Sequence, residues 1–329
     1  MSRRGEVAFV TGADGFIGSW VAERLLDEGA QVVILRRDKP ALSRLTIEGL
    51  IDRCDVVWGD LADHTSLLRV LNEYGVTTVF HLAAQAIVAV ANRSPLSTFE
   101  TNVRGTWNLL EAARLAPTVE RVVVASSDKA YGDHVELPYR EDAKLQPRFP
   151  YDTSKAAADL IARSYTETYG LPVAVTRLAN VYGGGDFNFS RLVPDTARSL
   201  LEGRAPVIRS DGSPERDFIY AADAASAYVA IADGLRDEQN HGQAFNAGAG
   251  RPWSVGEIVD TMIEVAGSDL SADVRGSGTP DGEIDRQYLD STLIRERLGW
   301  EPQWSLRDGL AETYGWYERN LPGLIPAGK

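Results

Sequence analysis

The stretch "VTGADGFIGSWVAERLL", residues 10–26, joins a short apolar run to a helical pattern through a turn that contains three glycines. Gly12, Gly15 and Gly18 stand at the spacing G-x-x-G-x-x-G. Glycine lets the backbone come close to a pyrophosphate, and the start of the following helix offers unpaired N–H groups and a positive dipole end. We therefore predict a dinucleotide-binding turn here. The alternative is that the glycines serve only tight packing of the helix.

Short β-branched runs alternate with longer helical patterns through the first half of the chain. Such alternation predicts right-handed strand–helix–strand crossovers. Strands that are hydrophobic throughout are typical of a parallel sheet buried on both faces. The predicted fold class is therefore α/β, with a Rossmann-like doubly wound parallel sheet. The expected strands are 6–11, 31–36, 55–59, 77–82, 120–127 and 171–178, and the expected helices are about 15–28, 63–74, 95–116 and 151–169.

After residue 180 the pattern loosens, which indicates a second lobe that interleaves with the first. A smaller, mixed α/β substrate-binding lobe is predicted at about 181–215 and 251–329. The dinucleotide-binding domain is predicted at 1–180 plus about 216–250, because "RDFIYAADAASAYVAIADGL" (216–235) reads as a strand that turns into a helix. The expected tail helices are 254–267, 291–298 and 305–320.

Charge and composition exclude several partners for this 329-residue chain. Its net charge of −13 argues against a nucleic-acid partner, which would require a basic face. No apolar stretch approaches the ~20 residues that span a bilayer, so no membrane partner is expected. The single cysteine, Cys54, allows no internal disulfide and suits a reducing cytoplasm, which is the expected location. No metal site is expected.

The second predicted strand ends in "VVILRRDK" (32–39), where NAD-specific sites usually carry an acid for the ribose hydroxyls. Arg36 and Arg37 occupy that place and suit a 2′-phosphate, so NADP is favoured over NAD. The alternative is that both arginines are solvated and Asp38 holds the ribose. The predicted cofactor-binding residues of the turn and the strand ends are Gly12, Asp14, Gly15, Phe16, Ile17, Gly18, Arg36, Arg37, Asp60, Leu61, Leu82, Ala83 and Ala84.

Tyr151 and Lys155, in "YDTSK", are four residues apart at the start of a predicted helix, so both project from one face. A lysine ammonium and a positive nicotinamide lower the pKa of a phenol, which is ordinarily about 10. Tyr151 would then take a proton from a substrate hydroxyl, and both residues would also contact the cofactor. Ser127, at the end of a strand, would hydrogen-bond the same substrate oxygen.

With these residues in view, the chain resembles an extended short-chain dehydrogenase/reductase of the nucleotide-sugar-modifying group. The resemblance runs nearly from end to end and rests on "TGADGFIGSW" (11–20), "GDLAD" (59–63), "HLAAQ" (81–85), "TNVRGTWNLLEAAR" (101–114), "SSDKAYG" (126–132), "YDTSK" (151–155), "RLANVYGGGD" (177–186), "RDFIYAADAASAY" (216–228) and "LGWEPQWSLRDGL" (298–310).

The resemblance implies that the second lobe binds a nucleoside diphosphate sugar. Asn180 and Arg216 would contact the diphosphate, with Arg209 and Arg286 as weaker candidates and Gln85 as a further substrate-binding residue. Arginine forks suit phosphate oxygens, and local arginines would let an acidic protein hold an anionic substrate.

The resemblance also implies a homodimer, formed by the helices at about 95–116 and 151–169. Leu109, Leu110 and Ala113, with an equivalent stripe on the second helix, would pair into a four-helix bundle. The alternative is that these stripes face only the sheet.

Ser127-Asp128-Lys129 indicates which reaction of this family to expect. By resemblance, members that invert C4 place small or uncharged residues after the serine, whereas members that dehydrate the sugar place an acid pair there. Asp128 falls on the position of the acid, and Asp-Lys resembles the cytidine-linked glucose 4,6-dehydratases. The expected function is therefore a nucleotide-sugar 4,6-dehydratase. The alternatives are a 4-epimerase or another oxidoreductase of nucleotide sugars, and a non-catalytic cofactor-sensing protein.

The role of Lys129 stays open at the level of sequence. A neutral Lys129 would remove the C5 proton as a base. A charged Lys129 would instead stabilise the enolate and leave proton transfer to Asp128. A third alternative is a solvated loop residue.

Overall fold

The computed structural model describes residues 2–278 and 284–323. Its largest element is a seven-stranded sheet in the order β10-β6-β5-β4-β1-β2-β3, with every neighbouring pair parallel. The chain order reverses between β1 and β4, which is where such sheets bind ligands. The strands are β1 (Val7–Thr11), β2 (Gln31–Arg36), β3 (Asp55–Trp58), β4 (Thr78–His81), β5 (Arg121–Ala125), β6 (Val173–Leu178) and β10 (Ala244–Ala247).

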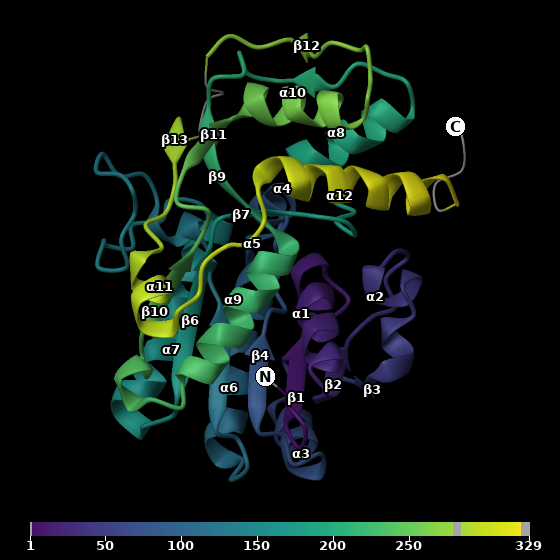
Figure 1. Cartoon of the computed structure of the whole chain (residues 1–329). Helices are drawn as coiled ribbons and strands as arrows, with labels where there is room; N and C mark the ends of the chain where they lie inside the picture. The colour runs from purple at the N-terminus through teal and green to yellow at the C-terminus, as the bar shows by residue number, and fades with distance from the viewer. Residues whose placement is uncertain (1, 279–283, 324–329) are drawn as a thin grey trace.

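Helices cover both faces of this sheet, as predicted for a doubly wound fold (Figure 1). One face packs against α1 (Phe16–Asp27) and α9 (Ala221–Gly234), which also contact each other. The other face packs against α3 (His64–Glu73), α6 (Gly105–Leu115) and α7 (Pro150–Tyr169). The two apolar cores confirm the predicted fold class, because the strands between the edge strand β3 and β10 are buried from both sides.

The predicted helix 95–116 consists of three consecutive segments. Helix α5 (Pro95–Phe99) leads into a π-helical turn, η2 (Glu100–Arg104), and then into α6. Within α6, Leu109, Leu110 and Ala113 are buried in the core of the same chain. The interpretation that these three residues face a second copy is therefore wrong, and the alternative that they face the sheet is confirmed.

A second, four-stranded sheet forms the centre of the smaller lobe, at the upper end of the molecule in Figure 1. Its strands are β7 (Asn180–Tyr182), β9 (Glu215–Tyr220), β11 (Pro252–Ser254) and β13 (Arg286–Gln287). Three helices build the lobe core with it, namely α8 (Leu192–Leu201), α10 (Val255–Val265) and α12 (Leu306–Asn320), and β8 (Val207–Ile208) pairs with β12 (Asp273–Val274).

The predicted domain boundary at about residue 216 falls inside β9, which pairs within the small sheet. The chain therefore returns to the large sheet only with α9 and β10. Helix α11 (Thr292–Leu298) packs on α9 and β10, although it follows the lobe strands in the sequence. Residues 279–283 and 324–329 of the predicted lobe lie outside the described residues.

The remaining elements are short. They are α2 (Arg44–Ile47), η1 (Leu50–Arg53), α4 (Val88–Arg93), η3 (Asp128–Tyr131), η4 (Glu238–Asn240) and η5 (Leu321–Gly323). Within the described ranges, no helix is both long and apolar enough to cross a bilayer.

Candidate functional site

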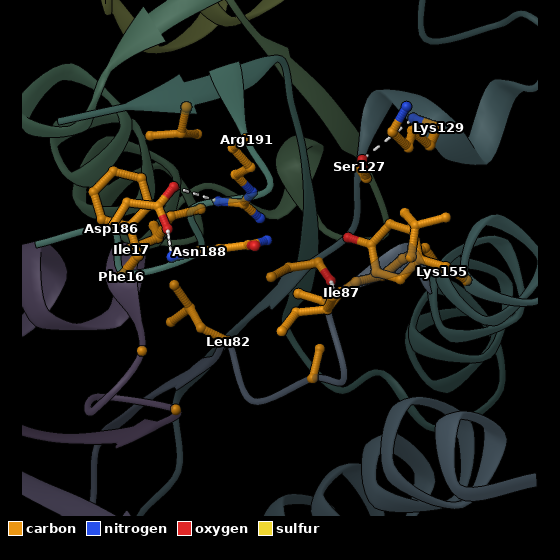
Figure 2. Close-up of a pocket in the computed structure, with 18 of the residues that line it drawn as sticks. Phe16, Ile17, Leu82, Ile87, Ser127, Lys129, Lys155, Asp186, Asn188 and Arg191 are labelled. Atoms are coloured by element: carbon orange, nitrogen blue, oxygen red, sulfur yellow. Dashed lines mark hydrogen bonds and ion pairs between the residues drawn. The ribbon is translucent and has the colours of Figure 1, made fainter. Parts of the chain in front are cut away.

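A cavity of about 1640 Å³ lies between the carboxyl ends of the large sheet and the smaller lobe. Residues from the β1–α1 turn, the ends of β2 and β4, turn η3 and the start of α7 line one side. Residues before and within α8 line the other side, together with residues of β9. Figure 2 shows Ser127, Lys129 and Lys155 across the pocket from Asp186, Asn188 and Arg191. The cavity is long enough to run from the glycine turn to the predicted catalytic residues.

The glycine turn is packed too closely for any other residue type at two positions. Gly12 has φ +77°, and a Cβ there would lie 2.7 Å from the backbone nitrogen of Ala83. A Cβ on Gly18 would overlap the carbonyl oxygen of Gly12. The turn therefore brings the backbone at the start of α1 directly to the cavity wall, which fits the diphosphate of a dinucleotide.

All thirteen predicted cofactor residues of the turn and the strand ends line this cavity. Arg36 is buried and donates to both carboxylate oxygens of Asp14, at 2.6 and 2.8 Å. Arg37 is exposed and pairs with Asp38 at 2.6 Å. The charge of Arg36 is thus matched inside the protein, whereas Arg37 and Asp38 both stand at the solvent edge where a ribose or its phosphate would lie.

Tyr151 and Lys155 line the cavity from the first turns of α7. Lys155 is buried, and its Nζ donates to the carbonyl of Ala125 at 2.8 Å. Desolvation lowers the pKa of Lys155 to about 8. Burial raises the pKa of Tyr151 to about 12, and the nearby charge of Arg191 works against that rise. The chain alone therefore does not make Tyr151 a base near neutral pH, so the bound nicotinamide's positive charge would have to supply the remaining lowering.

Turn η3 presents Asp128 to the same cavity. Ser127 caps the turn by accepting the backbone N–H of Lys129 at 3.2 Å, and its hydroxyl donates to Asp128 Oδ1 at 3.0 Å. Asp128 is only 3% exposed, and its Oδ2 has no hydrogen-bond partner among the described residues. Burial raises the pKa of Asp128, while the charges of Lys129 and Arg216 oppose this. A buried carboxyl group with one unpaired oxygen, in a residue that lines a cavity, is suited to proton transfer.

The structure places three charged residues in the cavity that the sequence reasoning missed. Asp152 follows Tyr151 directly, and burial raises its pKa to about 6 although Lys129 opposes the rise. Asp186 is buried and accepts from Arg191 Nη1 at 3.0 Å. The signals were present in "YDTSK" and in "GGGDFNFSR", where an acid follows the glycines and an arginine follows five residues later.

The predicted substrate residues divide into two groups. Asn180, Arg209 and Arg216 line the cavity, whereas Gln85 and Arg286 are not among its lining residues. The Gln85 backbone is held by Asn102, through bonds of 2.7 and 3.1 Å.

Arg216 and Arg286 lie on neighbouring strands, β9 and β13, and are held in different ways. Arg216 Nη1 donates to the carbonyl oxygens of Glu215 and Asp285, so its guanidinium group is already oriented. Arg286 forms an ion pair with Glu215 on the neighbouring strand, outside that wall.

Comparison with known proteins agrees with this site. The family model of GDP-mannose 4,6 dehydratase matches residues 9–313. The CDP-glucose 4,6-dehydratase of Salmonella typhimurium is 32% identical, over 97% of this chain and 92% of that protein. The UDP-glucose 4-epimerase of Mycolicibacterium smegmatis is 34% identical, over 92% and 96% respectively. A dTDP-glucose 4,6-dehydratase from Streptomyces venezuelae, solved with NAD bound, superposes with a TM-score of 0.86 at 32% identity, covering 97% of this chain and 100% of that one.

The matched region includes the glycine turn, the serine–tyrosine–lysine set and both walls of the cavity. These residues supply the backbone cradle and the proton-transfer groups that an NAD(P)-dependent enzyme acting on a hydroxyl requires. The chain belongs to the GDP-mannose 4,6-dehydratase family, and it is an NAD(P)-dependent enzyme of the extended short-chain dehydrogenase/reductase type.

Proposed function

We propose that this enzyme is a nucleotide-sugar 4,6-dehydratase that acts on a nucleoside diphosphate hexose, with CDP-glucose as the favoured substrate. The observation that carries the proposal is Asp128, a buried carboxyl group that lines the cavity beside Ser127 and has an unpaired oxygen. The substrate preference rests on the Asp-Lys pair and on the CDP-glucose 4,6-dehydratase relative.

The first step would be oxidation at C4 of the sugar, with the nicotinamide accepting a hydride there and later returning it to C6. Tyr151 would take the proton of the C4 hydroxyl, and Ser127 would hold the same oxygen. Lys155 has its ammonium fixed on the Ala125 carbonyl, and it lies on the same face of α7 as Tyr151. Positive charge beside a phenol favours the phenolate.

The second step would be loss of water across C5 and C6. A ketone at C4 makes the C5 proton acidic, so one group must remove that proton and another must protonate the departing C6 hydroxyl. Asp128 is held by Ser127 between the redox set and Lys129, and burial raises its pKa, which favours the protonated acid over the carboxylate. We assign the protonation of the leaving hydroxyl to Asp128, and the removal of the C5 proton to Lys129, which lines the cavity beside it and would act from its neutral form.

C4 epimerisation is the second candidate function. It is favoured by the epimerase relative from Mycolicibacterium smegmatis, which is as similar in sequence as the dehydratases are. An epimerase would need Tyr151 and Ser127 but no acid after the serine. Asp128 therefore distinguishes the two candidates.

The test is to incubate the purified enzyme with CDP-glucose, GDP-mannose, UDP-glucose and dTDP-glucose and to analyse the products by mass. Loss of one water from a substrate supports dehydration, and the fastest of the four identifies the base. A product of unchanged mass with inverted C4 would establish epimerisation instead.

The isosteric variant Asp128→Asn sharpens this test. Water elimination should slow by about 10²- to 10⁴-fold, the usual contribution of a general acid or base. Oxidation at C4 should continue, so reduced cofactor accumulates and is seen by its absorbance. Dehydration at an undiminished rate in the variant would remove Asp128 from the mechanism.

We further propose NADP as the preferred cofactor, because Arg37 is exposed at the ribose edge. Arg37→Ala should then weaken NADP binding about tenfold, the cost of one lost charged hydrogen bond, and leave NAD binding unchanged. Asp38→Ala tests the alternative, since loss of NAD affinity in that variant would assign the ribose to Asp38.

We also propose a homodimer, but with a different contact surface from the one that the sequence suggested. Trp107 on α6 and Leu160 on α7 are 43% and 57% exposed, and they replace the buried α6 stripe as the expected contact. Light scattering on the intact enzyme and on Leu160→Asp would test it, since a monomeric wild type excludes the interface.

A further inference from the structure

A buried network lies behind turn η3, on the side away from the cavity. Its centre is Arg177 on β6, which is 1% exposed and forms an ion pair with Asp159 through two hydrogen bonds of 2.8 and 3.1 Å. Arg177 Nη1 also donates to the hydroxyl oxygen of Tyr131 at 2.8 Å, and its guanidinium carbon lies 4.8 Å from the centre of that ring. None of these side chains lines the cavity.

The two partners of Arg177 belong to the two catalytic elements. Tyr131 is the last residue of the turn that carries Asp128 and Lys129. Asp159 follows Lys155 by four residues in α7, so it lies on the same helix face as Lys155 and Tyr151. One guanidinium group therefore joins the turn to the helix.

A neighbouring strand completes the attachment of the turn. The Tyr131 hydroxyl donates to Asn246 Oδ1 at 2.7 Å, and Asn246 stands opposite Arg177 in the pairing of β10 with β6. The Asn246 amide group donates in turn to the carbonyl of Tyr139 at 2.8 Å. Tyr139 donates its hydroxyl proton to the carbonyl of Gly132, the residue that follows the turn. The buried polar groups fix the turn because each has a defined partner.

The redox residues have a separate attachment. Lys155 is bound to the Ala125 carbonyl at the end of β5, and the Ser126 hydroxyl donates to the Lys155 carbonyl at 3.4 Å. These bonds do not pass through Tyr131 or Arg177. Lys155 on α7 can therefore keep its bond to the end of β5 when the link to the turn is weakened.

We propose that Arg177 and Tyr131 are positioning residues for the water-elimination step, which hold Asp128 and Lys129 at the substrate by tying turn η3 to helix α7. The inference rests on the proposed dehydratase function. The two steps of the reaction then depend on different contacts. The bonds between Lys155 and the end of β5 position the residues for oxidation at C4, and the Arg177 network positions the residues for water elimination.

Tyr131→Phe tests the inference, because it removes one hydroxyl group and keeps the buried ring over the guanidinium. With CDP-glucose as the probe, dehydrated product should form about 10- to 100-fold more slowly, since a misplacement of about 1 Å costs rates of that order. Oxidation at C4, followed as reduced cofactor in a single turnover, should stay within about threefold, and the affinity for CDP should not change. Reduced cofactor should then accumulate in this variant.

Thr313→Val is the matched control. Thr313 is fully buried in α12 and donates to the carbonyl of Gly309 at 2.6 Å, far from the turn. Tyr131→Phe removes two buried hydrogen bonds and Thr313→Val removes one, so both variants should lower Tm by a few degrees. Only Tyr131→Phe should change the ratio of C4 oxidation to dehydration, and an equal ratio in both variants would overturn the inference.

Hydrogen–deuterium exchange separates this inference from the proposed function. Amide exchange in residues 128–132 should be faster in Tyr131→Phe than in the wild type or in Thr313→Val. If the wild type dehydrates none of the four substrates, the proposed function fails, and unchanged exchange in this segment would also overturn the positioning role. If the wild type does dehydrate and Tyr131→Phe does so at the same rate, only the positioning role fails.

Discussion

The two walls of the cavity are built in different ways. On the cofactor side the backbone itself forms the wall, because Gly12 and Gly18 leave no space for a side chain. On the lobe side the wall consists of side chains, among them Arg216 and Arg191, which stand on short strands and beside a helix. A backbone wall tolerates almost no substitution, whereas a wall of side chains can change its ligand one residue at a time. This difference fits a family whose members share a cofactor type and differ in their sugars.

The largest effect is expected from Gly18→Ala, which breaks the backbone wall. The new Cβ would overlap the Gly12 carbonyl, so the turn must move away from the position in which its amides meet a diphosphate. Loss of one or two charge-assisted hydrogen bonds, each about 1.5–3 kcal/mol, should weaken cofactor binding by ~100-fold or more. Titration with NADPH, followed by its fluorescence, measures this.

Gly256→Ala in α10 of the lobe provides the control. A Cβ at Gly256 meets its nearest neighbour at an ordinary 3.5 Å, and alanine is favoured over glycine within helices. Cofactor affinity should stay at the wild-type value and Tm should not fall. Equal cofactor affinity in Gly18→Ala and Gly256→Ala would contradict the account of a backbone wall.

A smaller effect is expected from Arg216→Ala, which removes part of the side-chain wall. Arg216 lines the cavity and is held by two carbonyl oxygens, so it is oriented before any substrate arrives. Its loss should raise KM for the nucleotide sugar about 10- to 100-fold and leave kcat nearly unchanged, because contacts to a remote diphosphate act equally on ground and transition states. Steady-state kinetics with the preferred substrate give both values.

Arg286→Ala separates the two arginine candidates. Arg286 pairs with Glu215 and does not line the cavity, so KM should change by less than about threefold, as for an exposed ion pair. A large rise in KM for Arg286→Ala with none for Arg216→Ala would reverse the assignment.

The cofactor wall and most of the large sheet could be predicted from the sequence. Glycines at the first strand–helix junction indicate a close approach of the backbone to a diphosphate. Strands that are hydrophobic throughout indicate a parallel sheet. Six of the seven strands, and the helices α1, α3 and α7, accordingly lie within a few residues of the expected bounds.

The lobe could be predicted only in part. Strands of two or three residues, such as β8 and β13, carry no periodic signal, and β9 reads like any strand that precedes a helix. Arg191 and Asp186 were missed because their approach to Tyr151 depends on how the lobe folds over the sheet. The burial that raises the pKa of Tyr151 was not expected, since burial cannot be read from a motif.

The smallest expected effect is on the pH dependence of stability, and it comes from a buried histidine behind the cofactor side of the cavity. His81 at the end of β4 lies between the hydroxyls of Thr11 and Thr106, at 2.8 and 3.0 Å. Burial lowers the pKa of His81 to about 3, so the folded protein keeps this ring neutral where an unfolded chain would protonate it below about 6.5. The stability that this pairing provides is complete above about pH 6.5 and is lost as the pH falls toward 3, by at most about 1.4 kcal/mol for each pH unit.

His81→Gln isolates this contribution, because an amide group can bond to both hydroxyls and does not titrate. The variant should be less stable than the wild type at pH 7.5, and its free energy of unfolding should fall less steeply between pH 6.5 and 5. Urea unfolding at each pH measures the two slopes. Since the neutral ring stands in the cofactor half, NADPH at saturation should raise both curves without changing the difference in slope. Parallel curves for wild type and variant would mean that His81 is protonated in the folded protein and that the cofactor half is less tightly closed than its hydrogen bonds indicate.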